Sequence, residues 1–157
     1  MSKEETAVIA GIPPDRCTAL LEVAHDPFSR LVGVELLELS PGHSRVALTL
    51  EDCHLNSLAV AHGGAVFALA DQAFALASNS HGQAAVAINM SISYVAPSTT
   101  GDRLIAEANE QHLGGRTALY HIEVRTESGK LVASCQGLVY RKRESLAGLQ
   151  PHGKREG

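Results

Sequence analysis

Tryptophan is absent from this chain of 157 residues, and Phe, Tyr and Trp together make up only 4% of it. Proteins that bind single-stranded nucleic acid stack the bases on aromatic rings, and few rings are present here. The 13 Lys and Arg residues are outnumbered by 17 Asp and Glu residues, which gives a net charge of −4. Binding to nucleic acid through an excess of positive charge is therefore also excluded.

Cysteine is scarce as well. Cys17, Cys53 and Cys135 are an odd number at wide spacings, and no two of them form a C-x-x-C pair. This pattern predicts neither a disulfide framework nor a zinc knuckle. The N-terminus carries Glu4 and Glu5 where a signal peptide has basic residues. We therefore expect a protein of the reducing cytoplasm.

Charge is missing from the middle of the chain. Between Cys53 and Gly101, Asp71 is the only Asp, Glu, Lys or Arg. Residues 60–79 are apolar enough to resemble a membrane span, but the central Asp71 and His62 would make such a span costly. A buried helix of a globular core is the better interpretation. An isolated carboxylate there is costly unless it is hydrogen-bonded, protonated or functional, so Asp71 is a candidate catalytic residue and a structural carboxylate is the alternative.

The hydrophobic pattern predicts a single α+β domain over residues 1–143, followed by a flexible tail over 144–157. Apolar residues at helical spacing predict a short helix over 14–24 and a long one over 64–80. Alternating patterns predict strands at 31–39, 44–50, 86–94, 104–111, 117–126 and 131–141. The strand 86–94 has the most regular alternation, so we expect one of its faces to be buried. Short turns between the last strands require antiparallel pairing.

The residues that lead into the long helix carry a specific motif. They read His54-Leu-Asn56-Ser-Leu-Ala-Val-Ala-His62-Gly63-Gly64, and the helix continues to Asp71. This pattern, H-x-N-x5-H-G-G-x2-F-x-L-A-D, resembles the hotdog-fold acyl-CoA thioesterases, and among them the phenylacetic acid degradation type called PaaI. The likeness extends over roughly residues 25–142. Ala59 is a departure, because the family usually has Gly at that position.

The resemblance implies a hotdog fold, in which an antiparallel sheet wraps around one long central helix. It also implies hydrolysis of an acyl or aryl-acyl CoA thioester to the free acid and CoA, with no metal or other cofactor. The expected partner is a second copy of the chain, in a homodimer or homotetramer with sites at the subunit interface. Neither nucleic acid nor a membrane is an expected partner.

Residue roles follow from the resemblance position by position. It assigns the catalytic roles to Asp71 as base or nucleophile, the Gly63 N–H as oxyanion donor, Asn56 as a contact of the thioester and His62 as a positioning group. It assigns substrate binding to Gly64, Phe67, Pro97 and Arg116. Solvated surface is an equally good interpretation of Arg116.

The chemistry of these residue types agrees with the assignment. A helix N-terminus with bare glycines presents free N–H groups to an oxyanion, and a carboxylate can activate water or attack a carbonyl. We expect Asp71 to be buried among Phe67, Phe74 and Ala75, which would alter its basicity. About 13 Å of helix rise separates His62 from Asp71, so a site shared between two subunits is predicted.

Other interpretations of the same residues stay open. His54 and His62 can in principle share a metal, but no carboxylate or Cys stands at helical ligand spacing beside them, so no metal is expected. A non-catalytic acyl-CoA-binding or regulatory hotdog module would keep the glycine motif but have no use for Asp71. A hotdog hydratase ranks lower, because its arrangement of His and carboxylate is not found here.

Overall fold

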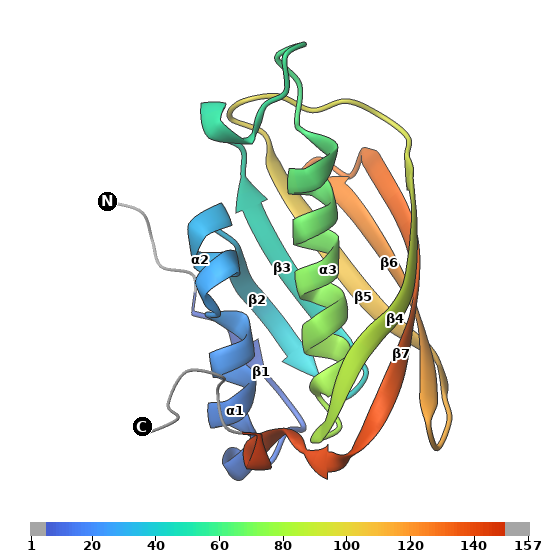
Figure 1. Ribbon diagram of the computed structural model, residues 1–157. Helices are drawn as coiled ribbons and strands as arrows, with labels where there is room; N and C mark the ends of the chain where they lie inside the picture. Colours follow the sequence, from blue (N-terminus) through green and yellow to red (C-terminus); the bar gives the residue numbers. More distant parts are fainter. Residues whose placement is uncertain (1–5, 150–157) are drawn as a thin grey trace, which may run out of the picture.

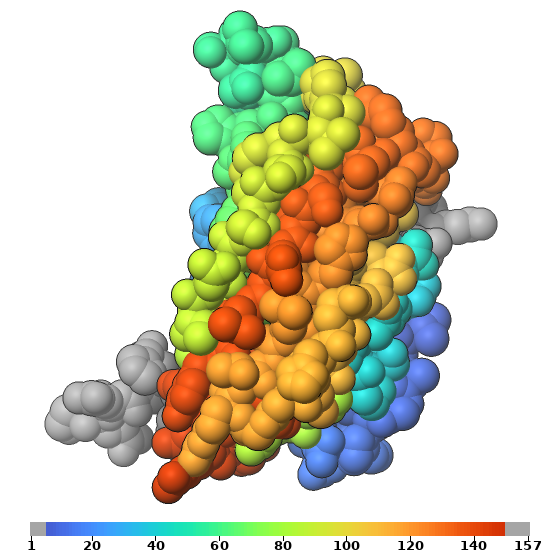
Figure 2. Space-filling view, turned by 90° about the vertical axis from the view of Figure 1, so that its right-hand side faces the viewer, coloured from blue at the N-terminus to red at the C-terminus, as the bar shows by residue number. Residues whose placement is uncertain are grey.

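A curved seven-stranded sheet wraps around one long helix in the computed structural model, which describes residues 6–149 (Figure 1). The strands are β1 (Val8–Ile9), β2 (Glu35–Ser40), β3 (His43–Thr49), β4 (Gln83–Tyr94), β5 (Arg103–Leu113), β6 (Thr117–Thr126) and β7 (Leu131–Ser145). Their order in the sheet is β1-β2-β3-β5-β6-β7-β4, and the outer face of the sheet is seen in Figure 2. Only the short β1 pairs in parallel, with β2. The predicted α+β hotdog architecture is confirmed.

Three α-helices and two short 3₁₀ helices complete the described chain. They are α1 (Pro14–Ala24), α2 (Pro27–Val32), η1 (Asp52–His54), α3 (Gly63–Asn79) and η2 (Leu146–Gly148). The bounds of α1 are those predicted, and those of α3 differ from the prediction by one residue at each end. None of the helices in residues 6–149 is long and apolar enough to cross a membrane.

The helix α2 is not predicted by the sequence pattern, which assigns its last residues to a strand over 31–39. The Asp26 side chain accepts a hydrogen bond from the Ser29 N–H, and Pro27 occupies the first turn. Gly33 then ends the helix at a φ of 92°, a left-handed conformation that favours glycine. Caps at both ends therefore outweigh the β-branched and apolar composition of this short segment.

The predicted boundary of the C-terminal tail is corrected by the structure. β7 runs on to Ser145, which pairs with Gln83, and the Leu146 N–H donates to the Gly82 carbonyl at 2.8 Å. Leu146 packs against the hydrophobic core. Residues 144–149 therefore belong to the domain, because Ser145 pairs with β4 and Leu146 buries its side chain against the core. The rest of the predicted tail, 150–157, lies outside the described residues.

The helix α3 lies close to the sheet because a glycine faces its largest side chain. A Cβ built on Gly137 of β7 would stand 2.6 Å from the Phe74 ring, so only glycine leaves room for it. Phe74 also meets the ring of Tyr120 edge-on, with centroids 5.7 Å apart. The Ser44 hydroxyl donates to the Ala73 carbonyl at 2.6 Å and ties β3 to the same turn of α3. These contacts set how α3 sits across the sheet.

A polar cluster anchors the C-terminal end of α3. Glu110 of β5 accepts a hydrogen bond from the buried Tyr120 hydroxyl at 2.7 Å and pairs with His81 Nε2 at 2.5 Å. Burial acts to raise the pKa of Glu110, but the hydrogen bonds from Tyr120 and His81 outweigh it and hold the pKa below its usual value. The ionised Glu110 therefore ties the loop after α3 to β5 and β6.

The strand β4 forms one edge of the sheet and is largely exposed. Val86, Ile88 and Tyr94 are 42%, 56% and 54% exposed. Met90 and Ile92 of the same alternating set are half-buried and pack against the core, so the predicted buried face is present only in part. A bulge between Ala87 and Asn89 interrupts the alternation, and no described strand covers the outer edge. A long apolar edge strand is a template for pairing with another chain. The β4 edge is therefore open to pairing with another strand.

We predict that Gly137→Ala destabilises the fold by about 1–3 kcal/mol, because the added methyl group collides with the Phe74 ring. Chemical denaturation measures the loss. Gly115→Ala is the matched control, since a Cβ there meets nothing within 4 Å. Equal stability of the two variants would show that α3 does not depend on this close approach.

Candidate active site

The loop before α3 is shaped by Asn56. Its side-chain oxygen accepts hydrogen bonds from the N–H groups of Leu58 at 2.9 Å and Val60 at 3.4 Å. The Asn56 N–H in turn donates to the Val60 carbonyl at 2.8 Å. Because the loop uses Oδ1, the amide nitrogen Nδ2 is left as a donor, and no acceptor for it is found within residues 6–149. Asn56 thus both closes the loop and offers a free N–H.

His62 caps α3 through its side chain. Its Nδ1 accepts a hydrogen bond from the Gly64 N–H at 2.8 Å, so the neutral ring carries its proton on Nε2. The Gly64 N–H is therefore occupied within the chain. The N–H of Gly63, at the first position of the helix, has no acceptor in the described part of the chain. Gly63 supplies the free backbone donor at this helix N-terminus.

Tyr94, at the end of β4, lies over Gly63. Its hydroxyl donates to the Gly63 carbonyl at 3.0 Å, and a Cβ built on Gly63 would stand 3.2 Å from its ring. Partial burial raises the pKa of Tyr94, and the Cys135 thiol adds to the rise, so the phenol stays protonated. Tyr94 thereby holds the peptide that joins Gly63 to Gly64 in place.

Three of the predicted site residues, Asn56, Gly63 and Pro97, meet in one groove of about 390 Å³. Its apolar walls come from the loop, α3, the segment after β4 and the start of β7; they include Val60, Val66, Val95, Ala96 and Val132. The groove therefore combines N–H donors at a helix N-terminus with apolar walls, which suits a carbonyl carried on an extended apolar chain.

Asp71 lies two turns further along α3 and does not line this groove. Contrary to expectation, its side chain is exposed in the single chain. Crowding by neighbouring atoms raises the pKa of the Asp71 carboxyl, and the negative charge of Asp26 raises it further. The distance along the helix agrees with the prediction that one subunit does not bring Asp71 to the groove.

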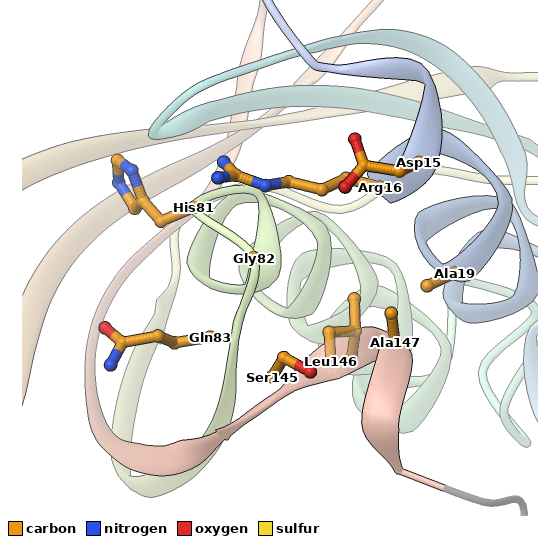
Figure 3. A pocket seen from close by; sticks show the side chains of 9 residues that line it. All are labelled: Asp15, Arg16, Ala19, His81, Gly82, Gln83, Ser145, Leu146 and Ala147. Carbon is orange, nitrogen blue, oxygen red and sulfur yellow. The ribbon is translucent and has the colours of Figure 1, made fainter.

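The other predicted residues are dispersed. Phe67 is half-buried on α3 and does not line the groove. Arg116 is exposed in the β5–β6 turn, where its carbonyl accepts from the Arg141 N–H at 2.7 Å. That turn lies at the opposite end of the sheet from Gly63 (Figure 1). A second pocket of about 340 Å³ between α1, the end of α3 and η2 contains none of the predicted residues (Figure 3).

No group of three or more His, Cys, Asp or Glu that could hold a metal is found within residues 6–149. His54 is used by the fold, since its Nδ1 accepts from the Glu51 N–H at 2.9 Å and its Nε2 contacts the Val32 carbonyl at 2.7 Å. These bonds hold η1 against the end of α2.

Comparison with known proteins places this geometry in a family. The model of the thioesterase superfamily matches residues 58–133. The acyl-coenzyme A thioesterase PaaI of Escherichia coli is 36% identical over 124 residues, which are 79% of this chain and 89% of that protein. The chain belongs to the thioesterase superfamily. It is a PaaI-type hotdog thioesterase and therefore a thioester hydrolase.

Solved structures agree with this membership. The E. coli PaaI protein from the phenylacetic acid degradation operon superposes with a TM-score of 0.79 at 34% identity, over 83% of this chain and 95% of that one. The phenylacetic acid degradation protein PaaI of Thermus thermophilus, solved in a mutant form, has a TM-score of 0.72 at 46% identity, over 74% and 100%. A Streptococcus mutans protein bound to acetyl CoA has a TM-score of 0.67 at 29% identity, over 69% and 88%.

The sequence pattern does not identify Tyr94, Ser98 or Asp26 as relevant to this thioesterase site. Tyr94 contacts Gly63 from the end of β4, and Ser98 lines the groove from the segment that follows. The charge of Asp26 raises the pKa of Asp71. Each residue is far along the chain from the residue it affects, so no local pattern marks it.

We predict that Ala59→Gly stabilises this thioesterase by up to about 1 kcal/mol, because Ala59 is held at a φ of 59° where glycine is not strained. Urea denaturation of the variant measures the gain. Ala19→Gly in the middle of α1 is the control, and it should lose about 1 kcal/mol. A loss at both positions would mean that the loop holds Ala59 without strain.

Proposed function

We propose that this thioesterase hydrolyses acyl-CoA thioesters, with an aryl-acyl group of the phenylacetyl type as the first substrate to test. The observation that carries the proposal is the free Gly63 N–H beside the Asn56 amide in an apolar groove. The name of the E. coli relative and the acetyl CoA bound to the S. mutans relative support CoA as the leaving group. The phenylacetic acid context of two relatives supports the aryl group.

The donors of the groove suit the carbonyl of a thioester. As water or a carboxylate attacks, negative charge develops on the carbonyl oxygen, and the Gly63 N–H stabilises it without rearrangement. Asn56 Nδ2 offers a second donor, since the loop already holds its oxygen. His62 is exposed next to Gly63, and its Nε2–H is a third donor that can orient the substrate.

Asp71 supplies the base or the nucleophile in this proposal. As a base it takes a proton from the water that attacks the thioester carbon, and as a nucleophile it forms an anhydride that water then hydrolyses. In both cases the thiolate of CoA leaves and is protonated. The carboxyl must be ionised to act, so its raised pKa sets the acid limit of activity.

The active site is completed by a second copy of the chain. The groove of one chain is lined by no carboxylate, and the chain's own Asp71 lies about 12 Å of helix rise from Gly63. The exposed apolar edge of β4 provides the surface on which a two-fold partner can pair. We accordingly assign a homodimer or homotetramer with interfacial sites, located in the cytoplasm.

The decisive experiment measures thiol release from phenylacetyl-CoA and from short, medium and long acyl-CoA thioesters. Wild-type protein should hydrolyse at least one of them. Binding of CoA with no hydrolysis of any thioester would instead support the acyl-CoA-binding module.

We predict that Gly63→Pro lowers kcat by about 10²- to 10³-fold, because proline removes the N–H while fitting the first helical position. Gly63→Ala is the control, since it keeps the N–H and adds a Cβ against the same Tyr94 ring. Steady-state kinetics compare the two variants. If both lose activity equally, crowding by Tyr94 explains the loss and the oxyanion role is wrong.

We predict that Asp71→Ala lowers turnover by about 100-fold or more without unfolding the protein. Refolding a 1:1 mixture of Asp71→Ala and Gly63→Pro chains should restore about one quarter of wild-type activity, since half the dimers are mixed and each mixed dimer has one intact site. No recovery in verified mixed dimers would show that each chain carries its own complete site.

We predict that Asp26→Asn shifts the acid limb of the pH–rate profile to lower pH. The negative charge of Asp26 raises the pKa of Asp71, so removing it lets Asp71 stay ionised in more acidic solution. Asn preserves the cap of α2, because its side-chain oxygen can still accept from Ser29. Asp15→Asn on α1 is the control. If the acid limb does not move in Asp26→Asn, the ionisation that limits activity at low pH is not that of Asp71.

A further inference from the structure

Ser98 carries an unpaired hydroxyl next to the groove. The residue is 4% exposed, and its Oγ is the buried side-chain oxygen that lacks a hydrogen-bond partner within residues 6–149. A buried hydroxyl with no partner costs free energy, so such groups are nearly always satisfied in folded proteins. We therefore expect the Ser98 hydroxyl to form its hydrogen bond with a ligand that enters the groove.

The fold does not use this side chain. The structural contact of Ser98 is made by its backbone, whose carbonyl accepts from the Ala61 N–H at 2.8 Å and joins the segment after β4 to the loop before α3. Alanine would keep that bond, fill nearly the same volume and leave no unpaired group. The presence of a hydroxyl is thus unexplained by packing.

The groove beside Ser98 narrows the choice of ligand. Ser98 lines it together with Asn56 and Gly63, while most of the remaining wall is apolar. Asn56 and Gly63 offer only N–H donors, whereas a hydroxyl both donates and accepts. An amide group needs both a hydrogen-bond donor and an acceptor when it leaves water, whereas an alkyl or aryl acyl chain needs neither. A serine side chain has three staggered rotamers, so it can turn to such a group without backbone movement.

We propose that the Ser98 hydroxyl binds the amide nearest the sulfur in the pantetheine arm of the substrate, an inference that rests on the acyl-CoA function proposed above. That amide follows the thioester sulfur by two methylene groups. Ser98 and Gly63 line the same groove, so one substrate can place its thioester carbonyl at Gly63 and this amide at Ser98. In this proposal the part of the groove beside Ser98 holds the CoA side of the substrate.

The test compares three thioesters of one acyl group: the CoA thioester, the N-acetylcysteamine thioester, which keeps only the first amide, and the S-propyl thioester, which has none. Ser98→Ala should lower kcat/KM about 3- to 10-fold for the first two, mainly through KM, and leave the third unchanged. The exposed Thr18 of α1 provides the control variant, Thr18→Ala, which likewise removes a hydroxyl and should change none of them.

Three kinetic outcomes would overturn the proposal: no loss with any thioester, an equal loss with all three, or a loss confined to the CoA thioester. Thermal unfolding of the ligand-free protein adds a separate readout. Ser98→Ala should melt at or above the wild-type temperature, and a lower melting temperature would show that the hydroxyl is already paired without ligand.

If wild-type protein hydrolyses no thioester, the proposed function fails. CoA binding by calorimetry then tests Ser98 alone, and the contact is overturned if Ser98→Ala binds CoA as wild type does.

Discussion

The close approach of α3 to the sheet is the constraint on which the rest of the structure depends. Because Gly137 of β7 has no side chain, the Phe74 ring can pack directly against this strand. Tyr120 of β6 packs edge-on against the same ring. A helix held this tightly cannot slide or tilt without opening its core. Its N-terminus, and with it the Gly63 N–H, is therefore fixed relative to Tyr94 at the end of β4.

This rigidity explains how a short glycine motif becomes a binding site. His62 accepts a hydrogen bond from the Gly64 N–H, and Asn56 accepts from two N–H groups of the loop. Tyr94 donates to the Gly63 carbonyl. After these bonds are made, the Gly63 N–H, the Asn56 Nδ2 amide group and the His62 Nε2–H have no acceptor within residues 6–149 and can donate to a ligand. The site is thus defined by the donors that the fold leaves unused.

The same architecture separates the two parts of the proposed site. Asp71 stands at the middle of α3, so the carboxylate and the donors are separated along the helix. The strand that follows α3, β4, ends the sheet with apolar side chains in solvent. The second copy of the chain that we propose would cover this edge and bring its own α3. Within one chain, the negative charge of Asp26 raises the pKa of Asp71.

Local patterns in the sequence determined the long helix, the antiparallel meander, and the thioesterase motif from His54 to Asp71. Caps, periodicity and turn residues act between near neighbours, so the chain reveals them without its fold. The tertiary structure alone decided that β4 is an edge strand, that α2 forms before β2, and that residues 144–149 join the domain. It also decided that Tyr94 meets Gly63, that the charge of Asp26 acts on Asp71, and that the Ser98 hydroxyl has no partner within residues 6–149. These depend on strand order and on contacts between distant residues, which one sequence does not encode in any local pattern.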